Sequence, residues 1–385
     1  MENNKKTGRT YSLLAAGIIV GMAVINILTP ARTFSENENR YLARFPELTA
    51  QTFLEGEFDR EFEEWATDHV AGRDFWIAGK AHLEQVFGKK ENNSVYFAAD
   101  GCLIEKQERP NSGQVQKNID ALLSLESLAQ YNSAVCIVPT ASEILREKLP
   151  PFAYKSYQND ALLQVERALA GRSITHIDTR GTLFENREAY IYYKTDHHLT
   201  TDGAYWVYKD IAAGLGINAY TQEEFERVEV DKNFLGTTWS KAMLAHAEND
   251  TILAYYPKFE SDFTLYFPAD DKTVEGLYAP QHLEGKDKYS YYLDGNHAVV
   301  HVRNALQNGR RLALFKDSYA HCIVPFLANH YEEIIMIDLR YYNADPVAYM
   351  QQHAVDDILV LYNGVNFQSD TNIAKLSVYT KEEPS

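Results

Sequence analysis

Short apolar segments alternate with helical patterns through most of the chain. The apolar segments have the length of buried strands, and the helix candidates between them carry apolar residues at helical spacing. Strands that are apolar on both faces are typical of a parallel sheet covered by helices on both sides. The strand candidates are Ala134–Val138, Ile174–Ile177, Arg311–Phe315, Glu333–Ile337 and Ile358–Leu361, and the helix candidates are Val115–Tyr131, Ala161–Leu169, Thr200–Leu215, Ser318–Asn329 and Pro346–His353. The pattern predicts an α/β fold with a doubly wound, mainly parallel sheet.

Residues 217–305 interrupt this alternation. They contain shorter strand-like runs joined by polar segments, at Ile252–Tyr256, Phe263–Phe267 and Ala298–Val302. We therefore expect a β-rich, antiparallel insertion within an α/β domain that extends over residues 94–375.

The region before this domain has a different pattern. Apolar residues recur at helical spacing between Phe53 and Gly88, and Gly72-Arg73-Asp74 is expected to interrupt them as a turn. We predict a helical neck over residues 30–93. It is followed by a hairpin of Ser94–Phe97 and Cys102–Glu105, since Asp-Gly is a strong turn signal.

No charged residue occurs between Thr10 and Ala31, and basic residues precede this segment. A run of about 20 apolar residues can span a bilayer, and a basic flank orients the N-terminus toward the cytoplasm. We expect a cytoplasmic tail at 1–10 and a transmembrane signal anchor at 11–29, which places the body on the extracellular face of the cell membrane. A cleaved signal peptide is the main alternative, because Thr29-Pro30-Ala31 ends in a small residue.

Charge and cysteine content exclude several classes of protein. The net charge is −17, and Lys and Arg form no cluster beyond the first ten residues, which argues against a nucleic-acid partner. The three cysteines (Cys102, Cys136 and Cys322) are widely spaced, which excludes a disulfide-dense scaffold and a cysteine-based zinc site. One disulfide with one remaining thiol stays open.

Ser318 directly follows one of the predicted buried strands. In open α/β sheets, ligands bind beyond the carboxyl ends of the strands. The free N–H groups of a following helical turn can stabilise an oxyanion there. Ser318 is therefore a candidate nucleophile, although serine is also a favoured helix N-cap, so a capping role is the alternative from this segment alone.

Asp196, His197 and His198 precede a predicted helix that Thr200 or Thr201 is expected to cap. Residues two apart in an extended chain face the same side, so Asp196 and His198 can point into one crevice. A carboxylate beside an imidazole fixes its tautomer and supports the imidazolium that forms when it accepts a proton. We predict Asp196 as the orienting group and His198 as the general base, with His197 as the alternative base.

Two other interpretations of this cluster stay open. One is a set of solvated side chains at a helix N-terminus. The other is a metal site in which His301 or His321 completes the ligands Asp196, His197 and His198. Against the metal site, adjacent histidines in a strand point to opposite faces.

Further candidates lie at the same edge of the predicted sheet. Asn363, after the last strand, is the first candidate for a second oxyanion donor, and Asn296 is the next. Arg340, Tyr341 and His197 are candidates for substrate binding, with a surface ion pair as the alternative for Arg340. Asp317 is expected to point away from the crevice and to act as a cap or a structural hydrogen-bond acceptor.

The segments TDHHLTTDGAYW and KDSYAHCIVPFLANHYEEIIMIDLRYY resemble the motifs of the DHHW protein family of Gram-positive bacteria. FSENENRYLARFPEL, GRDFWI and NNSVYFAADGCLIE resemble its N-terminal pattern, so the likeness covers nearly the whole chain. That family is similar to the alginate O-acetyltransferase (AlgJ/AlgX-type) group, in which an Asp-x-His pair precedes the serine as Asp196 and His198 precede Ser318 here. The resemblance implies an SGNH-like (flavodoxin-like) fold. Lys316 departs from the pattern, because an SGNH block usually has Gly at that position.

The resemblance and the candidate residues together predict a serine-dependent O-acyltransferase or esterase, with acetyl as the expected acyl group. The expected acceptor is a cell-envelope polysaccharide, no cofactor or metal is expected, and family analogy adds a multi-pass membrane O-acyltransferase that supplies acyl groups. A non-catalytic scaffold or glycan-binding component of an envelope-modification complex is the alternative. A metal-dependent hydrolase is a further one.

Overall fold

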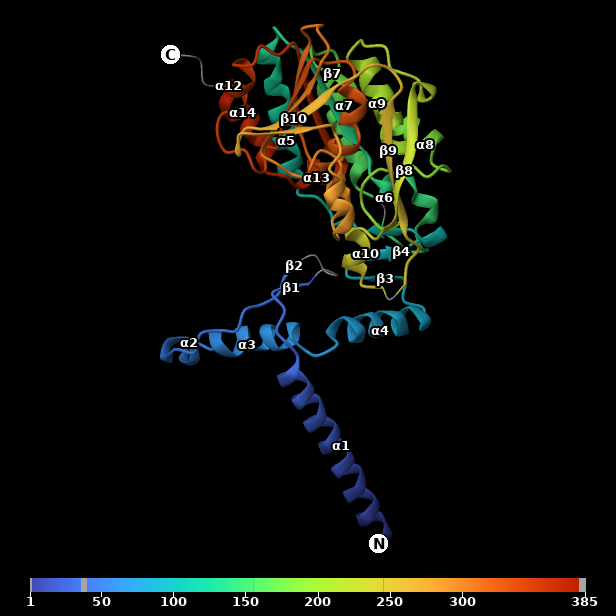
Figure 1. Ribbon diagram of the computed structural model, residues 1–385, viewed down its shortest axis with the longest axis vertical. Helices are drawn as coiled ribbons and strands as arrows, with labels where there is room; N and C mark the ends of the chain where they lie inside the picture. Colours follow the sequence, from blue (N-terminus) through green and yellow to red (C-terminus); the bar gives the residue numbers. More distant parts are fainter. Residues whose placement is uncertain (1, 36–39, 155, 245, 381–385) are drawn as a thin grey trace. The chain divides into compact units, whose positions relative to one another are not determined.

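The computed structural model describes residues 2–35, 40–154, 156–244 and 246–380, with the side chains of residues 2–10, 27 and 378–380 outside the description. The chain divides into two compact units, residues 1–89 with 243–246 and residues 90–242 with 247–385. Each unit is described by itself below (Figure 1).

The first unit is mainly helical. It contains α1 (Glu2–Leu28), α2 (Ala50–Leu54), α3 (Glu57–Asp68), α4 (Arg73–Val86) and a short antiparallel pair, β1 (Phe34–Ser35) and β2 (Arg40–Tyr41). Gly72 separates α3 from α4 with a φ of 68°, a conformation that glycine adopts without strain, so the predicted interruption is present. The side chains of the predicted cytoplasmic tail lie outside the described residues.

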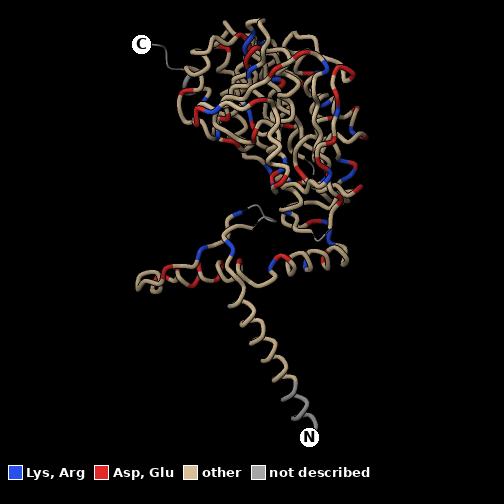
Figure 2. The backbone as a smooth tube through the Cα atoms, in the orientation of Figure 1, with Lys and Arg blue, Asp and Glu red and all other residues tan. Residues whose placement is uncertain are grey.

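From Tyr11, where the description of its side chains begins, α1 carries no charged residue (Figure 2). Within the described residues, however, no helix combines the length and apolar character needed to cross a bilayer. The anchor at residues 11–29 stays a prediction.

An eight-stranded sheet forms the centre of the second unit, with the strand order β11-β10-β12-β14-β13-β15-β6-β7. Neighbours among β14, β13, β15, β6 and β7 run parallel, and β12, β10 and β11 extend this sheet antiparallel on one side. The strands are β6 (Asn132–Val138), β7 (Thr175–Ile177), β10 (Phe263–Phe267), β11 (Lys272–Glu275), β12 (Val299–Asn304), β13 (Arg311–Lys316), β14 (Glu333–Ile337) and β15 (Asp357–Asn363). The prediction of a mainly parallel sheet is confirmed.

Both faces of the parallel strands are buried, as their continuous apolar runs predict. In β13, Leu312 and Leu314 belong to one core cluster, whereas Ala313 and Phe315 belong to the other. The first cluster includes α9 (Thr201–Gly214) and α11 (Val324–Leu327), and the second includes α5 (Ser112–Leu123), α7 (Gln158–Leu169), α12 (Pro346–Gln351) and α14 (Lys375–Thr380). Alternate side chains of each strand therefore pack against different helical layers.

The insertion at 217–305 is built from antiparallel strands, but it is not a separate sheet. Only β8 (Phe225–Phe234) and β9 (Asp250–Pro257) form their own two-stranded sheet, whereas β10, β11 and β12 join the central one. A small sheet of β3 (Glu91–Asn92), β4 (Val95–Phe97) and β5 (Leu103–Glu105) contains the predicted hairpin. The remaining helices of this unit are α6 (Ala141–Ile144), α8 (Arg180–Glu185), α10 (Thr237–Ala242) and α13 (Gly364–Ser369). Acidic and basic residues are interspersed over it (Figure 2).

The predicted single helix from Ser318 to Asn329 is wrong. A short 3-10 helix, η7 (Ser318–Cys322), precedes α11, and Pro325 lies at the start of α11. Proline has no N–H to donate to the carbonyl of His321, so one continuous α-helix would lack that bond. The cap of η7 is Asp317, whose Oδ1 accepts the N–H of Tyr319, and not Ser318.

All three cysteines are buried free thiols, so none of them forms a disulfide with another. Burial raises the pKa of Cys322 to about 12, which keeps it protonated at neutral pH.

Candidate active site

The carboxyl ends of β13 and β15 lie side by side because the two strands are parallel neighbours. Their register pairs Lys316 with Leu361, so Ser318 and Asn363, each two residues further along its strand direction, lie at the same end of the sheet. The Asp196–His198 loop precedes α9, whose N-cap is Thr200, since the hydroxyl of Thr200 accepts the N–H of Gly203. Two segments far apart in the sequence therefore supply one site.

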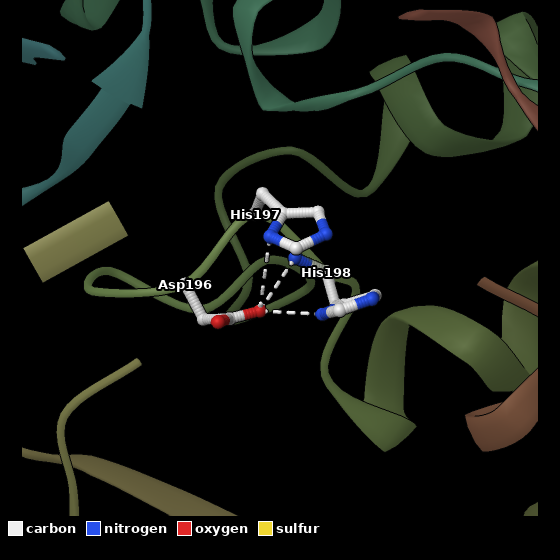
Figure 3. Close-up of side chains that lie close together, drawn as sticks. All are labelled: Asp196, His197 and His198. Carbon is white, nitrogen blue, oxygen red and sulfur yellow. Dashed lines mark hydrogen bonds and ion pairs between the residues drawn. The ribbon is translucent and has the colours of Figure 1, made fainter. Parts of the chain in front are cut away.

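Asp196, His198 and Ser318 form a continuous chain of hydrogen bonds. His198 Nε2 lies 2.8 Å from Ser318 Oγ, and His198 Nδ1 lies 2.6 Å from Asp196 Oδ1. Figure 3 shows the second of these bonds, together with the one that the backbone N–H of His198 donates to the same oxygen. With the Nδ1 proton held by the carboxylate, Nε2 is the acceptor that faces the serine hydroxyl. Asp196, His198 and Ser318 are 2%, 5% and 9% exposed.

Asp196 is fixed by a segment of the insertion. The backbone N–H and the hydroxyl of Thr237 donate to Asp196 Oδ2 at 2.8 and 2.9 Å. The preceding residue, Gly236, lies so close that a Cβ atom there would be 2.4 Å from the same oxygen. A side chain at Gly236 would displace the carboxylate, which explains why glycine occupies this position.

Asp250 binds the backbone of the segment that leads to Asp196. Its carboxylate accepts the backbone N–H of Lys194 at 2.9 Å and that of Thr195 at 2.7 Å. The hydroxyls of Thr195 and Tyr190 donate to it as well, each at 2.5 Å. A buried carboxylate with four donors sets the path of the chain directly before Asp196.

Tyr289 contacts both His198 and Ser318. Its ring stacks on that of His198, with centroids 3.7 Å apart and planes inclined by 8°, and its hydroxyl donates to the carbonyl oxygen of Ser318 at 3.2 Å. His197 also lies against His198, with ring centroids 3.8 Å apart. These contacts restrict the imidazole to one orientation.

The surroundings favour a neutral imidazole and an ionised carboxylate. Burial and the adjacent His197 lower the pKa of His198 to about 4, although Asp196 opposes this shift. Burial acts to raise the pKa of Asp196, but the two imidazoles and the hydrogen bonds from His198 and Thr237 outweigh it and hold the pKa below its ordinary value. At neutral pH His198 can therefore accept a proton.

The pH dependence of catalysis should reflect this low pKa. Because His198 accepts a proton only when neutral, kcat/KM for an ester is expected to rise with pH through about pH 4 and to change little from there to neutrality. His197→Gln should move the midpoint upward, since the charge of His197 contributes to the low pKa. A midpoint near 6.5, the ordinary histidine value, would contradict the geometry of a buried base.

A buried network of charged side chains lies next to η7, the 3-10 helix that begins at Ser318. Lys316 Nζ donates to His321 Nε2 at 2.8 Å and to Asp338 Oδ2 at 3.1 Å. Arg340 binds both oxygens of Asp338, with Nε at 2.8 Å and Nη2 at 2.6 Å. Lys316, His321 and Asp338 are almost fully buried. Burial lowers the pKa of Lys316, and Asp338 counteracts this.

Two of the predicted substrate-binding residues lie in or beside this network. Arg340 forms an ion pair with Asp338. A surface ion pair is the sequence-based alternative to substrate binding for Arg340, but its partner Asp338 is buried. Tyr341 is 52% exposed and lies under the Arg340 guanidinium.

Asn296, the second candidate for an oxyanion donor, is exposed, and its side-chain oxygen accepts from Arg340 Nη2 at 3.4 Å. Among the described residues, no hydrogen bond or ion pair joins Asn296 or Arg340 to Ser318, His198 or Asp196.

Asn363 is also engaged. Its Oδ1 caps α13 by accepting the N–H groups of Val365 and Asn366, and its amide donates to Asp317 Oδ2 at 2.7 Å. Among the described residues, the second amide N–H of Asn363 has no hydrogen-bond acceptor. Asp317 acts as the cap and structural acceptor that the sequence predicts, because its second oxygen also accepts from the backbone of Asn363 and from Asn366.

The structure does not bring His301 or His321 to the other three candidate metal ligands. Asp196, His197 and His198 present possible ligand atoms within 4.8 Å of one another, but neither His301 nor His321 belongs to this group of described residues. His301 is bonded to Glu333 and Tyr349, and His321 to Lys316. Asp196, His197 and His198 stay a possible three-residue metal site, in which Asp196 also holds His198 Nδ1 and His197 Nδ1 lies 2.8 Å from the hydroxyl of Thr237.

Fold and site define an α/β protein with an Asp-His-Ser hydrogen-bonded chain at the carboxyl edge of a mainly parallel sheet. The chain belongs to the DHHW family, since the model of that family, described as DHHW protein, matches residues 128–337. The resemblance predicted from the sequence motifs is therefore confirmed. No curated protein shows significant sequence similarity to the chain.

Solved structures share the fold. A DHHW family protein from Eubacterium siraeum is 22% identical with a TM-score of 0.62, and the match covers 74% of this chain and 96% of that one. Bacillus cereus PatB1 with a sulfonyl adduct is 20% identical with a TM-score of 0.61, over 72% of this chain and 97% of that one. The O-acetyltransferase domain of Pseudomonas putida AlgJ is more distant, at 12% identity with a TM-score of 0.46, over 74% of this chain and 99% of that one.

Proposed function

We propose that the protein is a serine-dependent O-acyltransferase or esterase that acts on a cell-envelope polysaccharide, with acetyl as the expected acyl group. The observation that carries the proposal is the 2.8 Å contact between Ser318 Oγ and His198 Nε2, with Asp196 bonded to the other ring nitrogen. A nucleophile, a base and an orienting carboxylate in this order are what acyl transfer through a serine ester requires. The sulfonyl adduct of the similar PatB1 supports the proposal, because sulfonyl groups attach to nucleophiles.

The reaction would proceed in two halves. Ser318 Oγ attacks the acyl carbonyl carbon while His198 Nε2 takes the hydroxyl proton, and the resulting imidazolium is stabilised by Asp196. The imidazolium of His198 then gives this proton to the departing alkoxide, and the acyl group stays bound to Ser318 Oγ as an ester. In the second half, His198 takes a proton from a glycan hydroxyl or from water, and the oxygen of that group attacks the carbonyl carbon of the ester. The bond between the acyl group and Ser318 Oγ then breaks, and His198 returns the proton to Oγ, which regenerates the serine.

The negative charge on the carbonyl oxygen needs donors. Ser318 is the first residue of η7, so its backbone N–H has no acceptor within that helix. No hydrogen bond of this N–H occurs within the described chain. The Ser318 N–H and the remaining amide N–H of Asn363 are the oxyanion donors in this proposal.

The setting of the reaction belongs to the same proposal. The uncharged N-terminal segment supports an anchored body on the extracellular face, and the acceptor polysaccharide follows from the family resemblance. A single anchor cannot carry acyl groups across a bilayer, so a multi-pass membrane O-acyltransferase is the proposed supplier.

The test is turnover of a chromogenic acetyl ester by the full chain in detergent. Chromophore release is expected from the native protein and from Ser133→Ala, a buried serine-to-alanine control on β6, but not from Ser318→Ala or His198→Ala. A sulfonyl fluoride should label Ser318 and stop turnover. A native protein with neither turnover nor labelling would contradict the proposal and favour a non-catalytic scaffold.

A further inference from the structure

A cavity of about 290 Å³ lies beside the catalytic chain in the second unit. Asp196, His197 and Thr237 form one of its walls, and Leu103 and Ile104 of β5 form another. Residues that follow β6 and β15, including Thr140, Ser142 and Val365, complete it at the carboxyl edge of the sheet. The cavity is therefore built from the same edge that presents Ser318.

Ser318 and His198 do not line this cavity. His197 separates it from the base, since its ring lies 3.8 Å from that of His198 and itself forms part of the wall. A group in the cavity would lie next to the reacting group and would not itself react. An extended substrate would place one unit at Ser318 and the adjoining unit in the cavity.

The charged side chains of the cavity are already paired within the described chain. Lys106 lies 3.2 Å from Glu91, and Lys241 lies 3.5 Å from Glu105. Asp196 is held by His198 and Thr237. The lining contains two cations, Lys106 and Lys241, and two carboxylates, Glu105 and Asp196, so these charges balance and the lining favours a neutral ligand.

Polar but uncharged groups supply the hydrogen bonds. Gln107 donates to the hydroxyl of Ser142 at 2.6 Å, and the buried Gln158 donates to the hydroxyl of Thr140 at 2.9 Å. Leu103, Ile104 and Val365 add apolar surface. A lining that combines fixed hydroxyls and amides with aliphatic surface matches a sugar ring, which carries both hydroxyls and C–H faces.

His197 adds an acceptor of defined orientation. The hydroxyl of Thr237 donates to Asp196, so toward His197 Nδ1 it can only accept. The proton of neutral His197 therefore sits on Nδ1, which leaves Nε2 to accept from a ligand hydroxyl. Figure 3 shows one ring nitrogen of His197 turned toward Asp196 and the other directed away from it.

We infer that this cavity is a subsite for a neutral sugar unit, the neighbour of the unit that exchanges its acyl group at Ser318. The inference rests on the proposed function and extends it, because it makes the acceptor or donor glycan an oligosaccharide that is neutral at this position. Binding energy from the adjoining unit would hold the reacting hydroxyl in place and favour transfer to the sugar over transfer to water.

The experiment compares acceptors with the full chain and a chromogenic acetyl ester. Neutral tetrasaccharides of the cellulose, chitin and starch series are tested beside their monosaccharides and beside an anionic oligogalacturonate, and acetyl transfer is measured relative to hydrolysis. Val365 and Ala141 both line the cavity, and Val365→Trp and Ala141→Phe fill it from two independent positions. Val274→Trp on the edge strand β11, at the opposite side of the sheet, is the matched control.

At least one neutral tetrasaccharide is expected to exceed its monosaccharide as acceptor by about tenfold or more. Both filling variants should lose this advantage, Ala141→Phe should keep ester hydrolysis within about twofold, and Val274→Trp should keep both the advantage and ester hydrolysis. Equal transfer to tetrasaccharides and monosaccharides, no transfer to any neutral sugar, an advantage for the anionic oligosaccharide alone, or an advantage that survives both filling variants would each overturn the inference. Absence of ester hydrolysis in the native protein would instead contradict the proposed function.

Discussion

Replacing Ser318 with alanine is expected to lower kcat for an acetyl ester by about 10⁴- to 10⁶-fold. The nucleophilic oxygen is lost, and His198 Nε2 loses the hydroxyl that lies 2.8 Å away. His198→Ala should cost about as much, since the serine then has no base. Asp196→Asn should lower kcat by about 10⁴-fold, because an amide in place of the carboxylate no longer fixes the tautomer with a proton on Nδ1.

The three residues are expected to act as one unit, so their effects should not add. The double variant Ser318→Ala/His198→Ala should be no slower than either single variant. Steady-state kinetics on the full chain measure all four variants, and Ser133→Ala serves as the unaffected control. Additive losses, or a Ser318→Ala protein with native turnover, would show that the hydrogen-bonded chain is not the catalytic machinery.

Replacing Asp338 with leucine is expected to destabilise the protein by about 3–5 kcal/mol. The buried Lys316 would lose its only carboxylate partner among the described residues, and Arg340 would lose both of its bonds to Asp338. Leaving a buried cation without a partner lowers the free energy of unfolding by more than the intact ion pair adds to it. The measurement is the midpoint of urea denaturation of the full chain at neutral pH.

The double variant Lys316→Met/Asp338→Leu is the matched control. It removes both members of the buried pair, and Arg340, with a side chain that is 26% exposed, can turn toward water. The double variant should recover a large part of the lost stability. If Asp338→Leu were as stable as the native protein, or if Lys316→Met/Asp338→Leu were less stable than Asp338→Leu, the unpaired Lys316 could not be the source of the destabilisation.

Residues that follow local rules were predictable from the sequence. The continuous apolar runs predicted the parallel strands, and the position of Ser318 after one of them placed it at the carboxyl edge of the sheet. The two-residue spacing of Asp196 and His198 predicted that both side chains reach one crevice. Pro325 was a visible signal as well, and its missing N–H explains why the predicted helix from Ser318 breaks.

The supports of the site could not be predicted in this way. Thr237, Tyr289 and Asp250 come from the insertion, and their contacts with Asp196, His198, Ser318 and the residues directly before Asp196 join positions 29 to 91 residues apart. No spacing or propensity rule links such positions, because the tertiary packing alone decides which side chains meet. The same packing commits Asn363 and Arg340, which the sequence suggested as ligand-binding groups, to Asp317 and Asp338.

Trapping the acyl-enzyme tests the serine mechanism most directly. The full chain is mixed with an acetyl ester, quenched in acid within the first turnovers, and digested for peptide mass spectrometry. An acetyl group on Ser318 in the native protein, and its absence in Ser318→Ala and His198→Ala, is the predicted result. Turnover of the ester with no acetyl group on Ser318, or with the acetyl group on another residue, would contradict it.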